Sequence, residues 1–176
     1  MPVLLAILAI IIIFALWAIS VQRKLVVLDE NINNAMSQIG LQLSSRFDAL
    51  MTLLDLTKVY DSDEYKNLVE TVQSGRSVIT ATSTPDDVLR QEGIIFETLD
   101  RIAAVTEQHN EIKENPMYMK TMNAIQVYES MIRNSRLIYN DSVTKLNRET
   151  RMFPVSILAR LFGFTERNYL AEHTSR

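Results

Sequence analysis

The residues that could support catalysis or bind a metal are few and scattered. His109 stands between Glu107 and Glu111 in a polar helix end, and the other histidine, His173, lies near the end of the chain. A zinc site needs three or four clustered nitrogen or sulfur donors. Neither histidine has a second histidine or acidic residue at a recurring ligand spacing, so the sequence predicts no metal site.

The acidic run at residues 61–64 is the closest approach to a calcium loop. The later ligands and the glycine of such a loop are missing, and a solvated helix start is the better interpretation. The sequence contains no nucleophile elbow, no phosphate-binding glycine loop and no dinucleotide fingerprint. We therefore expect no enzyme activity, no catalytic residue and no cofactor.

Composition excludes further classes of function. The chain has no cysteine, which removes disulfides, thiolate metal sites, thiol nucleophiles and a lipidated cysteine anchor. The net charge is −3 and no run rich in lysine or arginine occurs, so we expect no nucleic-acid partner.

The apolar segment at residues 3–19 organises the rest of the chain. It carries no charge, and with the next two residues a helix here spans about 28 Å, close to the thickness of the hydrocarbon core of a bilayer. A cleaved signal peptide is the alternative, but no basic residue precedes the segment and the cleavage site is poor. We predict a single-pass anchor over residues 1–21, whose representative positions are Val3, Leu4, Ile10, Ile12, Phe14 and, at the interface, Trp17.

The flanking charges give the expected orientation. Arg23 and Lys24 follow the segment, and nothing basic except the α-amino group precedes it. The positive-inside rule then favours a cytoplasmic location for the remainder of the chain.

Long helices are predicted to follow. Residues 22–60 carry apolar side chains at a mean spacing of about 3.6, the period of a straight amphipathic helix, so the anchor should continue into this helix without a break. Asp61 with Glu64 imitates a capping box for a second helix, which should fade at residues 80–83. Thr84 with Pro85 starts a third helix, and Pro116 starts a fourth that should run to Arg151.

Three charged residues occupy unusual positions. Glu129 and Arg136 fall on the apolar seam of the fourth helix. One interpretation is that their side chains extend to the edge of the seam. The other is a buried interhelical polar pair, with Arg46 of the first helix as a further partner, which would fix the register of the helices.

These lengths predict the architecture. Short loops make sequential helices antiparallel neighbours. We expect an all-α protein in which the transmembrane helix continues into an antiparallel up-down four-helix bundle with long first and fourth helices. The bundle should occupy residues 22–152, followed by an apolar C-terminal segment and polar tail at residues 153–176. The apolar segment at residues 153–164 should end near the membrane.

The C-terminal segment at residues 153–164 is unusually apolar after a helix-breaking proline. It could cap the membrane-proximal end of the core. The functional alternative is a docking patch for the membrane or a partner, made by Phe153, Pro154, Leu158, Leu161, Phe162 and Phe164.

Three blocks of the sequence are similar to the LemA family. Residues 34–50, NAMSQIGLQLSSRFDAL, resemble its first-helix signature; residues 136–143, RLIYNDSV, resemble a second block; and residues 153–164, FPVSILARLFGF, resemble the closing block. Met36 replaces the usual tryptophan, and Ser44 and Ser45 replace two basic residues. The lost charges weaken the case for an anionic partner of the first helix.

The resemblance implies a membrane-anchored helical domain in a bacterial inner or plasma membrane and no established reaction. Some members of the family are linked to organising bacterial membrane compartments, and others are encoded beside membrane proteases. Our first hypothesis is a scaffold that forms a homo-oligomer or organises other membrane proteins. The second is an adaptor or regulator of a membrane protease or signalling protein.

Overall fold

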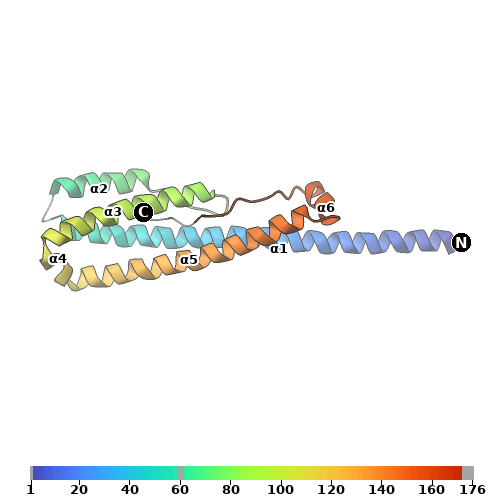
Figure 1. Cartoon of the computed structure of the whole chain (residues 1–176), viewed down its shortest axis with the longest axis horizontal. Coiled ribbons are helices and arrows are strands. Elements are labelled where there is room, and N and C mark those ends of the chain that lie inside the picture. Colours follow the sequence, from blue (N-terminus) through green and yellow to red (C-terminus); the bar gives the residue numbers. More distant parts are fainter. Residues whose placement is uncertain (1, 59–61, 172–176) are drawn as a thin grey trace. The chain divides into compact units, whose positions relative to one another are not determined.

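Every regular element in the part of the chain that the computed structural model describes, residues 2–58 and 62–171, is an α-helix. The predicted all-α class is confirmed. The helices in chain order are α1 (Pro2–Thr57), α2 (Ser62–Gly75), α3 (Pro85–Gln108), α4 (Asn110–Glu114), α5 (Pro116–Arg151) and α6 (Val155–Leu161) (Figure 1). The predicted N-cap at Asp61 and the histidine at position 173 lie outside the described residues.

The described residues form two compact units. The first unit combines the start of the chain, up to Ile32, with residues 138–169. The second unit holds residues 33–137, joined by Leu170 and the residue after it. Helices α1 and α5 each contribute to both units, and each unit is described below by itself.

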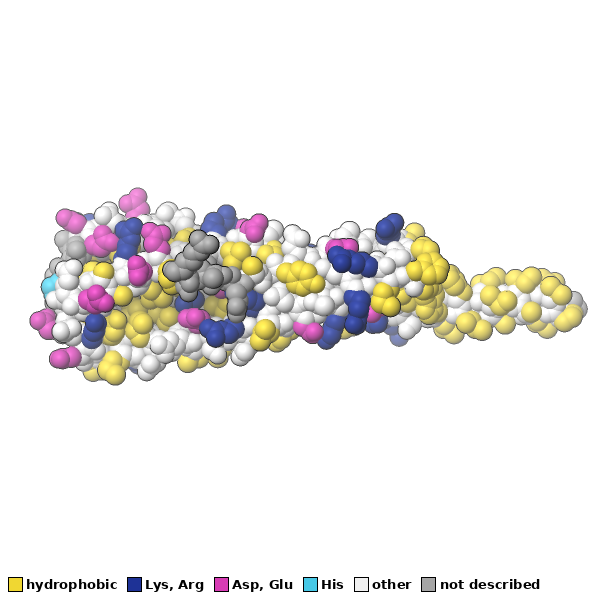
Figure 2. Space-filling model, in the orientation of Figure 1, with side chains coloured by type: hydrophobic (Ala, Val, Ile, Leu, Met, Phe, Trp, Pro, Cys, Tyr) yellow, Lys and Arg dark blue, Asp and Glu magenta, His cyan; other side chains and the backbone are white. Residues whose placement is uncertain are grey.

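In the first unit, α1 changes character along its length. Its first residues are apolar and exposed, as the hydrophobic surface at the N-terminal end in Figure 2 shows. From Val21 onward one face of the helix is buried, at Val21, Leu25, Leu28 and Ile32. The helix has no break between these two parts, as the sequence predicted.

The second unit has a core supplied by several helices. Helix α1 buries a stripe at the predicted helical period, and α2 packs against α3. The buried apolar residues of this unit include Met36, Ile39, Leu43, Phe47, Leu50 and Leu54 of α1, Leu68 and Val72 of α2, Val88, Ile95 and Ile102 of α3, and Ile125 and Ile132 of α5.

A close backbone contact explains the glycine within the second-unit part of α1. A Cβ atom at Gly40 would lie 2.2 Å from the backbone oxygen of Ile79, far inside van der Waals contact. Ile79 is itself buried, in the connection between α2 and α3. Glycine therefore allows this connection to lie directly against α1.

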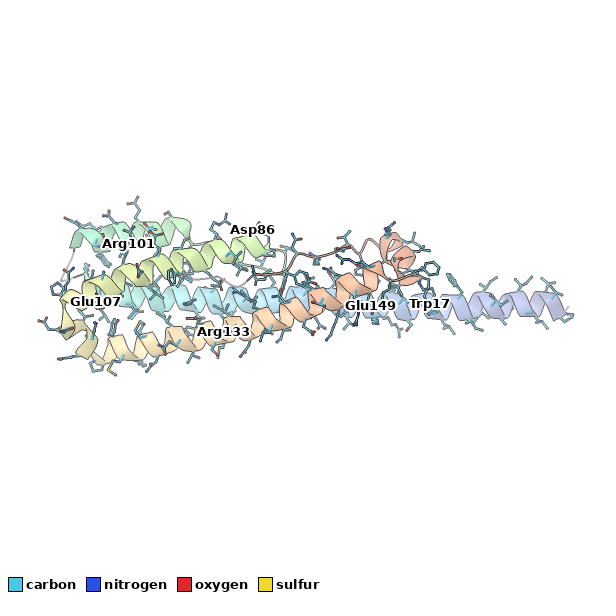
Figure 3. All side chains as sticks on the ribbon, viewed as in Figure 1. Trp17, Asp86, Arg101, Glu107, Arg133 and Glu149 are labelled. Carbon is cyan, nitrogen blue, oxygen red and sulfur yellow. The ribbon has the colours of Figure 1, made fainter. Side chains whose placement is uncertain are left out.

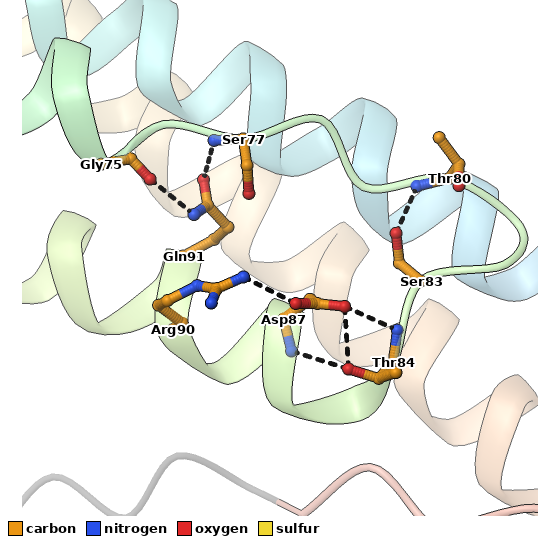
Figure 4. A network of polar contacts seen from close by, with 8 residues as sticks. All are labelled: Gly75, Ser77, Thr80, Ser83, Thr84, Asp87, Arg90 and Gln91. Carbon is orange, nitrogen blue, oxygen red and sulfur yellow. Dashed lines mark hydrogen bonds and ion pairs between the residues drawn. The ribbon is translucent and has the colours of Figure 1, made fainter.

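Side chains of α3 order the same connection (Figure 4). Gln91 is fully buried; its amide donates to the oxygen of Gly75 at 2.9 Å and accepts from the backbone N–H of Ser77 at 2.8 Å. Thr84 and Asp87 form the capping box that begins α3. The hydrogen bonds from Thr84, chiefly that from its backbone N–H, lower the pKa of Asp87.

Two element boundaries differ from the sequence prediction. Helix α2 ends at Gly75, although a helix fading at residues 80–83 was expected, because the residues after Gly75 bond to Gln91 instead of continuing the helix. The predicted third helix is interrupted at His109, whose non-helical backbone separates α3 from the short α4. The predicted bounds of α5, from Pro116 to Arg151, match the structure.

Candidate functional site

The first candidate site is the apolar start of α1. This helix is long and apolar enough to cross a membrane by length and composition. The predicted anchor residues are largely exposed, with the exception of the half-buried Trp17, which packs its ring 5.6 Å from that of Phe14. The exposed members are Val3, Leu4, Ile10, Ile12 and Phe14. A surface of this kind suits lipid far better than water.

The second candidate site is the C-terminal apolar segment, where α6 has two apolar faces. Leu158 and Ala159 are buried, whereas Ile157 and Leu161 are 61% and 75% exposed. Leu158 therefore belongs to the core and not to the proposed docking patch, and Ile157, which we had not assigned to the patch, lies on the surface.

The other members of the proposed patch surround this helix. Phe153 is 80% exposed, Pro154 and Phe162 are also exposed, and Phe164 is half-buried. The segment thus has a buried face, which fits the cap interpretation, and an exposed face, for which the docking patch stays a prediction.

A glycine ends α6. Gly163 has φ +80°, a backbone conformation that residues with a Cβ atom rarely adopt. Its N–H donates to the backbone oxygen of Arg160 at 3.2 Å, and the N–H of Phe164 donates to the backbone oxygen of Ala159 at 2.9 Å. This pair of bonds is the Schellman motif, which gives the Leu-Phe-Gly-Phe block of the sequence a local structural role.

The residues after α6 are bound to α5 within the first unit. Asn147 is buried; its amide donates to the oxygen of Arg167 and accepts from the N–H of the same residue, each at 2.9 Å. The hydroxyl of Tyr139 donates to the oxygen of Asn168 at 3.0 Å. These bonds satisfy the backbone of a segment that has no regular structure of its own.

Ion pairs attach these elements to α1. Lys24 lies 2.8 Å from Glu149 of α5, and Arg167 lies 2.8 Å from Asp29. In Figure 3, which labels Trp17 and Glu149, α6 lies at the level of Trp17 along α1. The C-terminal segment of this unit therefore lies beside the end of the apolar stretch of α1.

The third candidate site is an interhelical charge cluster in the second unit, formed by Arg46, Glu92, Glu129 and Arg136. Arg46 of α1 donates to Glu129 of α5 at 3.1 Å. Arg136 of α5 donates to both carboxylate oxygens of Glu92 of α3, the longer bond being 2.6 Å. Arg136 thus pairs with Glu92 of α3 and not with Glu129, the partner that the sequence had suggested.

Burial differs between the two pairs of this cluster. The side chains of Arg136 and Glu92 are each 9% exposed, whereas Glu129 is 47% exposed and extends toward solvent. Desolvation lowers the pKa of Arg46, and the charges of Glu129 and Glu92 oppose that shift. The Nε atoms of Arg46 and Arg136 are buried without a hydrogen-bond partner.

A cleft opens beside the charge cluster. Its volume is about 460 Å³, and its wall combines the four charged side chains with apolar residues. The apolar part includes Phe96, Leu99 and Ala103 of α3 and Met122 and Ile132 of α5. Such a mixed wall can take an amphipathic partner, because it offers both apolar area and charged groups.

Potential metal ligands are not gathered into a cluster within the described residues. No group of three or more histidine, cysteine or acidic side chains in residues 2–58 and 62–171 is placed to hold a metal ion. The carboxylates of Asp63 and Glu64 form ion pairs with Lys66 and Arg101 at the start of α2.

One family model matches the chain. It is the LemA family, matched over residues 35–176, which include the second and third blocks and almost all of the first block that resembled this family in the sequence. No curated protein matches the chain.

Proposed function

The chain belongs to the LemA family, and we propose that it is a non-enzymatic, single-pass membrane scaffold that self-associates or organises other membrane proteins. The observation that supports this proposal is the continuity of α1. One uninterrupted helix joins an exposed apolar stretch to the buried stripe of the helical domain. A continuous helix transmits position, because it has no loop that could bend freely between the lipid and the domain.

The scaffold proposal includes an architecture and a location. The short connections between helices favour an antiparallel up-down four-helix bundle in which α1 and α5 are the long members. We place the anchor in a bacterial inner or plasma membrane, with the bundle on the cytoplasmic side, because Arg23 and Lys24 follow the apolar stretch.

Tethering gives this scaffold its mechanism. Molecules that are confined to one membrane meet at a high effective concentration, so weak contacts between their helical domains suffice for assembly. The domain then needs no deep ligand pocket, only a constant orientation that presents the same surface on each copy.

The mass of the full chain in a mild detergent tests the proposal. Size-exclusion chromatography with light scattering should give the protein mass of a homo-oligomer, after subtraction of the detergent. Crosslinking in native membranes should give the same ladder of copies or add other membrane proteins to it. A single-chain mass together with no crosslinked species would refute the scaffold.

The cleft of the second unit favours a second candidate, an adaptor or regulator of a membrane protease or signalling protein. An adaptor uses a specific surface, and the cleft has both charged and apolar walls. Two adjacent, exposed alanines give a matched test, since Ala103 lines the cleft and Ala104 does not.

In the adaptor hypothesis, Ala103→Trp fills the cleft and abolishes the crosslink to one dominant partner, while Ala104→Trp leaves that crosslink in place. In the scaffold hypothesis each of the two single variants remains a homo-oligomer. Equal loss in both variants would point to a damaged helix rather than a blocked cleft, and circular dichroism of the two proteins detects such damage.

A further inference from the structure

An exposed apolar ridge runs along the outer side of the C-terminal segment. Phe153, Ile157 and Leu161 follow one another at intervals of four residues and are 80%, 61% and 75% exposed. Ile157 and Leu161 both lie in α6, where a separation of four residues places side chains on one face, and Phe153 precedes this helix. The buried Leu158 and Ala159 hold the opposite face against the first unit, so the ridge is fixed in direction.

The ridge lies at the level along α1 where the apolar stretch of that helix ends. Trp17 is half-buried although the residues before it are exposed, and α6 lies at the level of Trp17 along α1 (Figure 3). Hydrophobic side chains in the region of α6 adjoin the apolar surface of α1 in Figure 2. Tryptophan is typical of the membrane interface, so the ridge of α6 is at interfacial depth when α1 spans a bilayer.

Polar groups border the ridge in a pattern that matches a lipid. Ser156 and Arg160 line a shallow hollow together with Ile157 and Leu161. The hollow thus has a cation and a hydroxyl on one side and apolar side chains on the other. A phospholipid offers the matching groups, because its anionic phosphate is joined to apolar acyl chains.

The charge balance of the first unit leaves several cations available. Glu149 and Glu166 are already paired with Lys24 and Arg151. Arg23, Arg148 and Arg160 are exposed, and no ion pair is seen for them within the described residues. Cations next to a membrane surface attract anionic lipids.

We propose that α6 is an interfacial helix that inserts its ridge into a bilayer and binds the phosphates of anionic lipids through Arg160, with Arg23 and Arg148 adding to the attraction. This proposal rests on the anchor of the proposed function and adds the lipid class that the domain recognises. A second copy of the chain is the weaker candidate, because three side chains are small against an interface of about 800 Å² per partner.

A spin label on the ridge tests the proposal in the full chain. The protein has no cysteine, so Ile157→Cys gives a single labelling site on the exposed ridge. Val78→Cys is the matched control, because Val78 is an equally apolar position that is 85% exposed in the second unit. Both proteins are reconstituted into vesicles of phosphatidylcholine, with or without phosphatidylglycerol.

The expected result is that the label at position 157 becomes accessible to oxygen and protected from a polar nickel relaxant in the anionic vesicles, while the label at position 78 does not. Arg160→Gln in the labelled protein should lower the ratio of inserted to free label about fivefold, the effect of removing one cation from an anionic surface. Protection that is equal in neutral vesicles would overturn the anionic-lipid part of the proposal.

Two further outcomes contradict the whole proposal. A label at position 157 that stays open to the nickel relaxant shows that the ridge does not insert. Dipolar broadening between labels, without protection, shows that the ridge contacts a second copy. Flotation of the protein with the vesicles reports the anchor separately, so a ridge that fails to insert in a protein that floats leaves the proposed function intact.

Discussion

Removing one partner of the most buried ion pair should destabilise the protein strongly. Glu92→Leu leaves the guanidinium of Arg136 in a site where only 9% of its side chain is exposed. Its Nε already has no hydrogen-bond partner, so the charge would lose its main compensation. Breaking a buried pair in this way costs about 3–5 kcal/mol in free energy of unfolding.

The double replacement gives the contrasting result. Glu92→Leu with Arg136→Met removes both charges and fills the site with side chains of similar size, which is often neutral for stability. The free energy of coupling between the two positions should therefore be about 3 kcal/mol or more in a double-mutant cycle. Arg46 is also stabilised by the charge of Glu92, so part of the single-mutant effect arises there.

The assay is urea unfolding of the full chain in a mild detergent, followed by circular dichroism at the helical band. An unchanged dependence on denaturant shows that the variants unfold in the same manner. Arg101→Met is the control, because this residue pairs with Glu64 and Glu97 at the surface and its side chain is 48% exposed. Such pairs contribute about 0.2–1 kcal/mol. A cost of Glu92→Leu within that range would refute the argument.

Two further predictions concern the second unit. Gly40→Ala places a Cβ against the backbone oxygen of Ile79 and should lower the free energy of unfolding by about 1–3 kcal/mol. In the control Gly93→Ala, the new Cβ meets nothing within 4 Å, and the free energy of unfolding should rise by up to about 1 kcal/mol. Denaturant titration measures both variants, and equal effects would contradict the close contact at Gly40. Asp87 has a lowered pKa because Thr84 donates to its carboxylate, so its contribution is present above about pH 4 and is lost as the pH falls through its folded value. Asp87→Asn should therefore reduce the loss of stability as the pH falls below about 4, and an unchanged acid dependence would count against the capping box.

The period of the apolar residues was enough to predict much of the fold. It placed the buried stripe of α1, because one face of a long helix must pack while the other meets solvent. Pro116, and Thr84 followed by Pro85, located two helix starts, since these residues act through local chemistry.

The ion-pair partner of each buried charged residue could not be predicted in the same way. Arg136 and Glu129 share a helix face in the sequence, yet Arg136 pairs with Glu92 of another helix. A helical period tells which residues face inward and does not tell which residue of a neighbouring helix stands opposite. For the same reason the buried Gln91, which bonds to a loop backbone, gave no signal in the sequence.

The sequence also could not show which apolar residues of α6 are exposed. Ile157 and Leu158 are adjacent and both apolar, and only the structure shows that the second is buried and the first is not. An element that is apolar on both sides has no periodic contrast from which a buried face could be read.

The fate of the apolar start of α1 tests the central claim most directly. Native membranes are extracted with alkaline carbonate, and the intact mass of the retained protein is measured by mass spectrometry. An anchor predicts the mass of a chain that keeps residues 3–19, recovered with the membranes. A mature chain that begins after Ser20, or a chain released by carbonate, would contradict the account.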